Sequence, residues 1–412
     1  MYSEPIIEVL KQQGKVKPTL IQERTYDAIR QGESVVGLAK TGSGKTLAYS
    51  LPVLERLHHG QTSAAVIFEP TTELAVQTRH VLQPYAAALD LKMLSLVGAG
   101  NRQRQLQQLK KRKPEVLIAT PGRFFDFFSA NKIKPDQIQS LIIDEADDVL
   151  ELFKTDLIAS LGQQLSDDSQ ILLFGASESD VTKKCEQLFD RQFLKIDVRS
   201  EQVSHVEHGF LQVSNQYKIE FLQRLVKQDD FKGLLFFDRE ENLEHYAAIL
   251  RHTKMNFDVL SKKQSKQAQE HALKKLAHGQ TRLLLVTDLA ARGLDIPGLT
   301  YVVNFEIPET RNVYLHRAGR TGRMNAFGRV ITLGDDHDFR DLRKMLMPDE
   351  VTRVYFTKTS LSTHLIVTPK VKKTSSVSQS KSVPSPVKHK KDRWRQKKNK
   401  GYHPRGKEKR EI

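Results

Sequence analysis

Short apolar runs alternate with helical patterns along most of this chain, and this alternation constrains the fold more than any other feature. Seven such runs lie at residues 35–38, 65–68, 93–97, 116–119, 141–143, 171–174 and 193–196. The alternation restarts near Phe210, with runs at 233–237, 257–260, 283–286, 300–305 and 330–333. Strands that are separated by helices form parallel sheets with helices on both faces. The sequence therefore predicts an α/β protein with two doubly wound domains in tandem.

The length and the composition divide the chain further. A chain of 412 residues exceeds what one core usually supports. Residues around 197–207 are polar and lack helical periodicity, so they are typical of a linker. We place the first domain at 1–198, the linker at 199–207, the second domain at 208–358 and a tail at 359–412. The tail has too few apolar residues to offset the entropy of ordering, so we expect it to be disordered.

The tail also carries most of the positive charge. Between Thr368 and Ile412 there are sixteen Lys and Arg against three Asp and Glu, so this segment supplies +13 of the formal +16. Trp394 and Tyr402 lie within the basic run, and exposed aromatic rings can stack on unpaired bases. We favour a tail that tethers RNA over one that only keeps the protein soluble.

Several classes of protein are disfavoured. No apolar run approaches the roughly 20 residues that cross a bilayer, and the N-terminus does not resemble a secretion signal. Cys185 is the only cysteine, which excludes an intramolecular disulfide and a cysteine metal cluster. We expect a cytoplasmic, monomeric protein with no membrane partner and no disulfide partner.

A phosphate-binding loop follows the first apolar run and precedes a helical pattern at 47–57. Glycines in such a loop let backbone N–H groups approach phosphate oxygens, and the start of the helix adds a positive dipole end. Lys45 is expected to contact the outer phosphates of ATP, and the Thr46 hydroxyl to bind Mg²⁺. The alternative, a Gly/Ser turn with a chance lysine, fits this context poorly. The predicted loop is Ala39, Lys40, Thr41, Gly42, Ser43, Gly44, Lys45 and Thr46.

An acidic cluster, Asp144-Glu145-Ala146-Asp147, follows the apolar run at 141–143. Ligands of open α/β sheets bind at the carboxyl ends of the strands. We expect Asp144 to hold Mg²⁺ and Glu145 to orient and deprotonate the attacking water. Without the phosphate loop, a solvated acidic turn would be the commoner explanation.

A basic cluster lies in the second domain, where residues 316–323 read His-Arg-Ala-Gly-Arg-Thr-Gly-Arg. Arginines beside an ATP site can neutralise charge on the phosphate that is transferred. Arg320 and Arg323 are the candidates for this role. A basic surface loop is the alternative that this stretch alone leaves open.

Taken in this order, the three motifs closely resemble those of DEAD-box RNA helicases, and the likeness covers roughly residues 17–333. The resemblance implies two RecA-like domains that close over ATP and RNA together. It implies that Gln22 reads adenine, that Asp295 contacts the ribose, and that Arg320 and Arg323 reach the γ-phosphate. It also implies contacts to the RNA backbone from Pro70, Thr71, Thr120, Pro121, Gly122, Arg123, Thr287 and Arg292.

The sequence departs from the family where the two domains communicate. Residues 174–177 read Phe-Gly-Ala-Ser in place of the family's Ser-Ala-Thr segment, so Gly175 lacks the first hydroxyl. The resemblance assigns interdomain coupling to Asp147, Gly175, Ser177 and His316. Thr72 also replaces an arginine that is usual in an RNA-binding segment. These departures affect the coupling and RNA-binding segments, and none of them lies at Lys45, Asp144, Glu145, Arg320 or Arg323.

The leading hypothesis is an ATP-dependent RNA helicase that grips the RNA backbone and separates short duplexes when ATP binds, with hydrolysis for release. Structured or ribosomal RNA is the expected partner, in ribosome assembly or RNA turnover. An ATP-gated RNA clamp with little unwinding is the second hypothesis, and a DNA translocase is the third.

Overall fold

The first sheet is built entirely from parallel strands. The computed structural model describes residues 2–177, 184–201, 206–291, 296–322, 326–347, 350–356 and 361–362. Seven strands pair in the order β3-β4-β2-β5-β6-β1-β7. They are β1 Val35–Leu38, β2 Ala65–Phe68, β3 Met93–Leu96, β4 Val116–Ala119, β5 Ser140–Ile143, β6 Gln170–Gly175 and β7 Leu194–Asp197.

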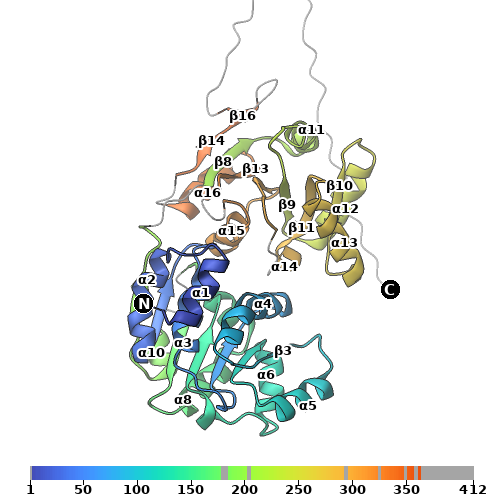
Figure 1. The fold of residues 1–412 in the computed structure, drawn as a ribbon. Helices are drawn as coiled ribbons and strands as arrows, with labels where there is room; N and C mark the ends of the chain where they lie inside the picture. The colour runs from blue at the N-terminus through green and yellow to red at the C-terminus, as the bar shows by residue number, and fades with distance from the viewer. Residues whose placement is uncertain are drawn as a thin grey trace, which may run out of the picture. The chain divides into compact units, whose positions relative to one another are not determined.

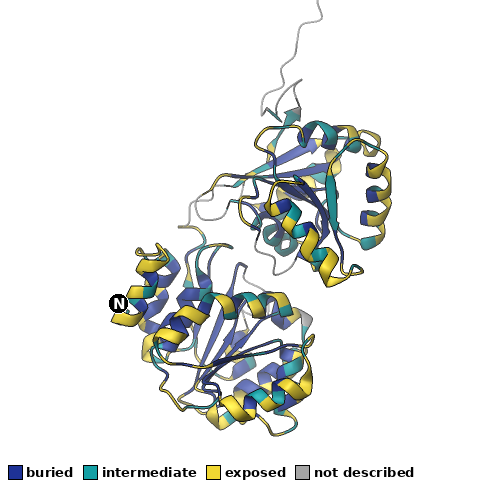
Figure 2. Ribbon diagram, turned by 45° about the vertical axis from the view of Figure 1, so that its right-hand side comes forward, coloured by how far each residue is buried: buried dark blue, intermediate teal, exposed yellow. Residues whose placement is uncertain are grey.

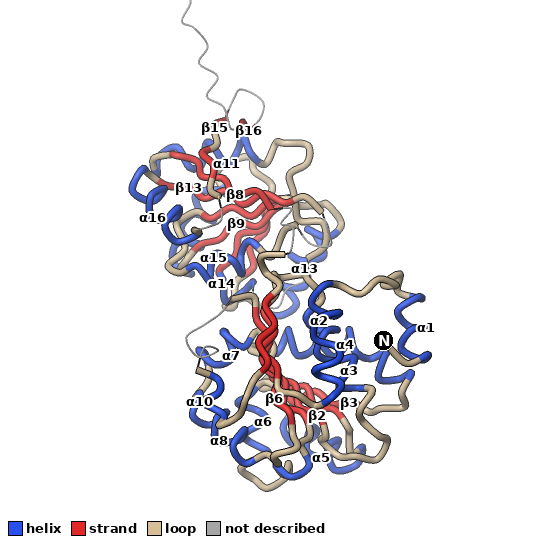
Figure 3. Tube along the Cα trace, turned by 90° about the vertical axis from the view of Figure 1, so that its left-hand side faces the viewer, coloured by secondary structure: helices blue, strands red, loops and turns tan. Residues whose placement is uncertain are grey.

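Helices cover both faces of this sheet (Figures 1 and 3). One face packs against α1 Glu4–Gln12, α2 Leu20–Gln31, α3 Lys45–Leu54 and α4 Thr72–Ala88. The other packs against α5 Arg102–Arg112, α6 Pro121–Phe128, α7 Ala146–Leu152, α8 Thr155–Gln164 and α10 Cys185–Phe189. A 3₁₀ turn, η1, spans Pro135–Gln137. Coverage on both faces explains why the β5 run Ser-Leu-Ile-Ile is wholly buried and does not alternate with polar residues.

The second sheet repeats this architecture, with its strands in the order β10-β11-β9-β12-β13-β8-β14. The strands are β8 Val206–Gln212, β9 Gly233–Phe237, β10 Phe257–Leu260, β11 Leu283–Thr287, β12 Tyr301–Asn304, β13 Gly328–Gly334 and β14 Thr352–Arg353. The helices α11 Asn215–Leu225 and α12 Glu240–Arg251 cover one face. The other carries α13 Lys266–Ala277, α14 Asp288–Ala291, α15 Arg311–Ala318 and α16 Asp336–Leu346.

In both sheets the central strands are buried and the helices expose one side, whereas the edge strand β7 is largely exposed (Figure 2). The predicted fold class, two tandem doubly wound parallel sheets, is confirmed. Two strands of the second sheet have no counterpart among the predicted runs. Strand β8 mixes polar residues and a glycine with its apolar ones, and β14 has only two residues, so neither shows a strong apolar run.

The edges of the predicted segments differ in detail. Strand β8 begins at Val206, two residues before the start of the predicted second domain. Within the predicted tail, β16 Leu361–Ser362 pairs antiparallel with β15 Tyr355–Phe356. Residues 363–412, with Trp394 and Tyr402, lie outside the described residues. In the part of the chain that the structure describes, no helix is long and apolar enough to cross a membrane.

Candidate ATP and RNA site

The strand order brings the two halves of the predicted ATP site to one edge of the first sheet. The phosphate loop follows β1, and Asp144 follows β5. Only β6, which ends at Gly175, lies between these two strands. The predicted RNA segments follow β2 and β4, on the other side of β5. Strand order therefore separates the predicted nucleotide-binding residues from the predicted RNA-binding residues of the first domain along one sheet edge.

The phosphate loop has the backbone that its glycines permit. Gly42 and Gly44 have φ values of +79° and +89°, and α3 begins at the next residue, Lys45. A Cβ on Gly44 would lie 2.6 Å from Gln22 Nε2 and displace it, and the positive φ itself favours glycine at this position. Gln22 Nε2 donates to the Gly44 carbonyl at 3.1 Å, and its Oε1 accepts from the Thr19 N–H at 3.0 Å. Gln22 thus ties the start of α2 to the loop.

Lys45 lies buried between the loop and the acidic cluster. Its Nζ donates to the Ala39 carbonyl at 3.3 Å and lies 3.7 Å from Glu145 Oε1. The residues 45 and 145 therefore meet in space although 100 positions separate them. A lysine held among oxygen atoms is placed to bind a further anion, because its three donors need acceptors.

Asp144 is held by a residue that the motifs did not identify. The hydroxyl of Tyr49, on α3, donates to Asp144 Oδ2 at 2.7 Å, and the Glu145 N–H donates to Oδ1 at 2.9 Å. Burial and the Glu145 charge raise the pKa of Asp144 to about 6, although Lys45 and the Tyr49 hydrogen bond act in the opposite direction. Tyr49 lies four positions after Lys45, but a buried helical tyrosine usually belongs to the core, so only the contact reveals its role.

Glu145 occupies an unusual backbone conformation. Its φ of +44° and ψ of +55° are left-handed, and it caps the N-terminus of α7. Such a conformation costs about 1 kcal/mol or more in a residue with a side chain, and it is concentrated at functional sites. Glu145 Oε2 is buried and has no hydrogen-bond partner among the described residues. An unpaired carboxylate oxygen can accept a proton or bind a water molecule.

Asp147 connects the two domains. His316 Nε2, on α15, lies 3.5 Å from Asp147 Oδ2, and His316 Nδ1 lies 3.7 Å from Asp148 Oδ2. Burial lowers the pKa of His316, but the hydrogen bond to Asp147 and the charges of Asp148 and Asp147 outweigh it and raise the pKa to about 8. The His316 imidazole therefore carries a proton at neutral pH and faces the carboxylates of Asp147 and Asp148. Side-chain oxygen and nitrogen atoms of Glu145, Asp147 and His316 also lie within 4.8 Å of one another.

Gly175 lacks the hydroxyl that the family has in this segment, and it lies beside a buried oxygen of Asp147. Ser177 Oγ donates to Asp147 Oδ2 at 2.5 Å, but Asp147 Oδ1 is buried without a hydrogen-bond partner among the described residues. A Cβ on Gly175 would lie 3.2 Å from that same Oδ1. The missing hydroxyl at 175 and the unpaired oxygen of Asp147 are therefore adjacent.

A second glycine brings the phosphate loop and the basic cluster together. A Cβ on Gly319 would lie 2.6 Å from Thr41 Cβ, closer than real side chains approach. Gly319 immediately precedes Arg320 in the chain. The close approach therefore places the Arg320 backbone next to the phosphate loop.

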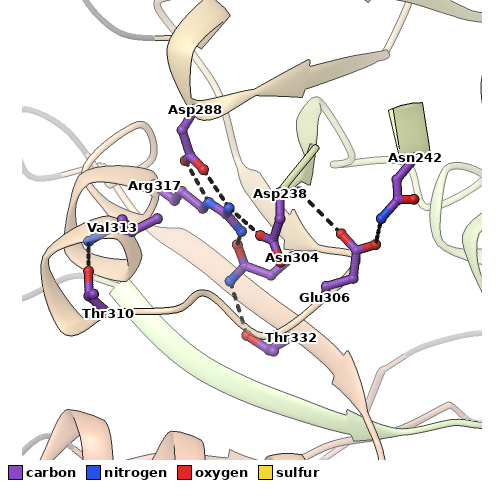
Figure 4. Close-up of polar contacts among 9 residues, drawn as sticks. All are labelled: Asp238, Asn242, Asp288, Asn304, Glu306, Thr310, Val313, Arg317 and Thr332. Atoms are coloured by element: carbon purple, nitrogen blue, oxygen red, sulfur yellow. Dashed lines mark hydrogen bonds and ion pairs between the residues drawn. The ribbon is translucent and has the colours of Figure 1, made fainter. Parts of the chain in front are cut away.

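Arg317 is fully buried and anchors α15 to the carboxyl edge of the second sheet (Figure 4). Its Nε and Nη2 donate to both oxygens of Asp288, at 2.7 and 2.6 Å. Nη2 also donates to Asp238 Oδ1 at 2.7 Å, and Nη1 to Asn304 Oδ1 at 3.1 Å. These partners follow or end β11, β9 and β12, so one side chain joins the helix to three strands. We did not predict this role, because spacing within the motif does not distinguish Arg317 from its neighbours.

The predicted RNA-binding residues differ in how exposed their side chains are. Thr71 begins α4 and its hydroxyl accepts from the Leu74 N–H at 3.2 Å, while Pro70 and Thr120 remain partly exposed at the same edge. Gly122 is exposed, whereas Pro121 and Thr287 are buried. The Arg123 guanidinium makes its hydrogen bonds within the protein. Arg123 donates to the carbonyls of Gly98 and Gly100 at 2.8 and 3.0 Å.

Comparison with known proteins bears on this arrangement. Residues 19–184 match the DEAD/DEAH box helicase family, and residues 217–325 match the helicase conserved C-terminal domain. A probable ATP-dependent RNA helicase of Bacillus subtilis, YfmL, is 34% identical over 337 residues, which cover 81% of this chain and 89% of the relative. This chain belongs to the DEAD-box ATP-dependent RNA helicases. The DEAD-box helicase CshC of Bacillus cereus is 31% identical, over 82% of this chain and 87% of its own length.

Solved structures agree with the fold of this helicase. Saccharomyces cerevisiae Dbp5, bound to RNA and ADP-BeF3, aligns with a TM-score of 0.73 at 23% identity, covering 86% of this chain and 94% of Dbp5. Mss116p bound to single-stranded RNA and AMP-PNP gives the same TM-score at 23% identity, covering 86% of this chain and 78% of Mss116p. At this level of identity the likeness concerns the fold.

Some predicted residues of the helicase lie outside the described part of the chain. They are Arg292, Asp295 and Arg323. Among the ATP-site predictions in the first domain, Gln22, the phosphate loop, Asp144 and Glu145 meet at one sheet edge. Sequence reasoning missed Tyr49, Arg317 and a fully buried glutamate, Glu69, at the end of β2. For Glu69 the local signal was a charged residue directly after four apolar ones.

Proposed function

We propose that this ATP-dependent RNA helicase binds Mg²⁺-ATP at the carboxyl edge of its first sheet and couples hydrolysis to the opening of short RNA duplexes. The contact between Lys45 and Glu145, with Tyr49 on Asp144, carries the proposal. It brings a phosphate-binding cation, a candidate metal ligand and a candidate base into one buried cluster.

The side chains at this edge fit magnesium. Mg²⁺ prefers oxygen ligands and retains several waters, so it is usually held through one or two carboxylates and the substrate phosphates. Asp144 and Thr46 offer oxygen donors, and Glu145 Oε2 is an unpaired oxygen nearby. When bound, the ion neutralises charge on the β- and γ-phosphates. Asp144 and Thr46 would hold it.

The chain's own residues account for the remaining steps. Lys45 replaces its contact with Glu145 by contacts to the outer phosphates of ATP. Glu145, freed from Lys45, orients a water and accepts its proton as the water oxygen attacks the γ-phosphorus and the bond to the β-phosphate breaks. Arg320 approaches the loop next to Gly319 and neutralises charge on the departing phosphate; the same role is proposed for Arg323.

RNA is proposed to lie across the ends of β2 and β4. Thr71, Thr120 and Gly122 remain accessible there for backbone contacts, which position a strand without reading its bases. Arg123 is bonded to the loop at 98–100, so we now propose that it positions this loop and does not contact RNA directly. Coupling runs through Asp147, Ser177 and His316.

Three measurements on the full chain test this function: ATP turnover alone, turnover with RNA or DNA, and displacement of a short RNA duplex. We expect stimulation by RNA and displacement that requires ATP. Glu145→Gln should lower turnover by about 10²-fold or more, because it removes the base. Glu151→Gln, an exposed carboxylate on the same helix, is the matched control and should change little. Stimulation by DNA alone, or equal turnover in both variants, would contradict the proposal.

An ATP-gated RNA clamp is a second candidate function. The unpaired Asp147 Oδ1 beside Gly175 supports it, because this oxygen lies at the end of β6 on the same carboxylate that contacts His316. A clamp would show turnover stimulated by RNA and tight binding with a non-hydrolysable ATP analogue, but no displacement of the duplex.

We further propose ribosomal RNA as the substrate, in ribosome assembly or RNA turnover. The relatives YfmL and CshC, which are bacterial, support this proposal. Crosslinking the protein to cellular RNA and sequencing the bound fragments tests this assignment. Enrichment of messenger RNA without ribosomal RNA would contradict it.

A further inference from the structure

Glu69 is a third carboxylate beside the candidate ATP site. Its side chain is 0% exposed, and it follows β2 directly. Strands β2 and β5 pair in parallel with Phe68 opposite Ile143, and the Asp144 N–H donates to the Phe68 carbonyl at 3.0 Å. Glu69 and Asp144 are therefore the next residues on two neighbouring strands, whose backbones lie about 4.8 Å apart. Residues at the same register also point to the same face of a sheet.

One oxygen of this carboxylate has no partner. Glu69 Oε1 accepts from the Thr78 hydroxyl, on α4, at 2.5 Å. Glu69 Oε2 is buried and makes no hydrogen bond to any of the described residues. Glu69 forms no ion pair with any of the described residues. The nearby Lys45 is paired with Glu145. A fully buried polar atom without a partner is uncommon in folded proteins and indicates a missing ligand, ion or water.

The charge balance at this edge indicates which ligand is missing. Glu69, Asp144 and Glu145 carry three negative charges when ionised, and Lys45 supplies one positive charge. A buried carboxylate without a counter-charge is costly, and like charges on adjacent strands add to the cost. A divalent cation removes the imbalance, whereas a water molecule alone does not.

We propose that Glu69 is an additional ligand of the nucleotide-bound magnesium, acting through the ion's water shell beside Asp144. The inference rests on the proposed ATP site and extends it by one residue. Mg²⁺ keeps several of its waters in proteins, and a carboxylate just outside the coordination sphere accepts hydrogen bonds from them. Thr78 then has the role of orienting Glu69, with Oε1 held and Oε2 directed to the site.

The test measures metal binding directly. Mn²⁺ is titrated into the full chain with saturating ADP and followed by electron paramagnetic resonance, for wild type and Glu69→Gln. Removal of a carboxylate that orients a metal's waters lowers affinity by roughly 10-fold or more. Glu115→Gln is the matched control. Glu115 is also 0% exposed, but it lies at the opposite end of the sheet and accepts from the N–H groups of Gly60 and Lys92. Equal Mn²⁺ affinity in wild type and Glu69→Gln overturns the proposal.

Thermal unfolding supplies a second readout. With Mg²⁺ and ADP, wild type should gain more stability than Glu69→Gln, because the variant binds the ion more weakly. Equal gains in the two proteins overturn the proposal.

Two further results separate the possible failures. If Glu69→Gln does not fold, Glu69→Asp keeps the charge but withdraws it by one methylene, and it should still weaken Mn²⁺ binding. If wild type itself binds ADP without any response to Mn²⁺, the proposed ATP site is wrong, and the assignment of Glu69 falls with it. If wild type binds Mn²⁺-ADP and Glu69→Gln binds it equally well, only the role of Glu69 is wrong.

Discussion

Replacing Arg317 by methionine should destabilise the second domain strongly, although no part of Arg317 need touch ATP or RNA. Methionine keeps the length of the side chain and its apolar contact with Phe236, over which the guanidinium now lies at 5.1 Å. It removes the bidentate pair with Asp288, the bond to Asp238 and the bond to Asn304. Two carboxylates are then left without their counter-charge.

The magnitude follows from the burial of these groups. Removing one member of a buried ion pair costs about 3–5 kcal/mol, because the remaining charge stays uncompensated. Asp288 and Asp238 retain 28% and 25% exposure, so water can solvate them in part, and we expect the lower end of that range. About 3 kcal/mol corresponds to a fall in melting temperature of roughly 6–12 °C for a domain of this size.

The control is a second arginine of the same domain. Arg329 pairs with Glu207 at 3.1 Å and with Asp230 at 3.5 Å, but its side chain is 33% exposed and both partners are more than half exposed. Exposed pairs contribute about 0–1 kcal/mol, so Arg329→Met should cost about 1 kcal/mol or less. Calorimetry of the full chain, with denaturant unfolding, measures both variants. The reasoning would be refuted if Arg317→Met lowered the free energy of unfolding by no more than Arg329→Met does.

Three further predictions concern coupling, pH and the tail. Gly175→Ser places a hydroxyl beside Asp147 Oδ1, so it should raise the number of duplexes displaced per ATP while changing ATP turnover little; a drop in both would contradict the coupling role. Protonation of His316 stabilises its contact with Asp147, so about 2 kcal/mol of stability should be present below pH 6.5 and lost as the pH rises through about 8. Unfolding curves at pH 6 and pH 9 should show this loss in wild type and its absence in His316→Gln. Deleting the residues after Lys370 should weaken RNA binding and its salt dependence but preserve turnover at saturating RNA, and equal RNA affinity in both proteins would contradict a tethering tail.

Much of this helicase could be predicted from local pattern. Apolar runs indicated all seven strands of the first sheet, and most of these strands are recognisable because they are buried on both faces. The phosphate loop and Asp144-Glu145 were recognisable because their chemistry needs particular residues at particular spacings. Strands β8 and β14 escaped prediction, since β14 is a two-residue edge strand and β8, which pairs with it, carries polar residues and a glycine.

The contacts that hold the site depend on which strands are neighbours, and no local pattern specifies this. Tyr49 meets Asp144 across 95 positions because β1 and β5 both flank β6. Glu69 lies beside Asp144 because β2 pairs with β5. Arg317 is buried because α15 crosses the ends of three strands. The hydrophobic periodicity of a segment indicates which side of its helix or strand faces the core. The order of the strands instead depends on long crossover connections and on pairing between distant segments. The motifs of the chain therefore predicted Asp144 and Glu145 as residues of the ATP site. The order of the strands decides which residues lie around them.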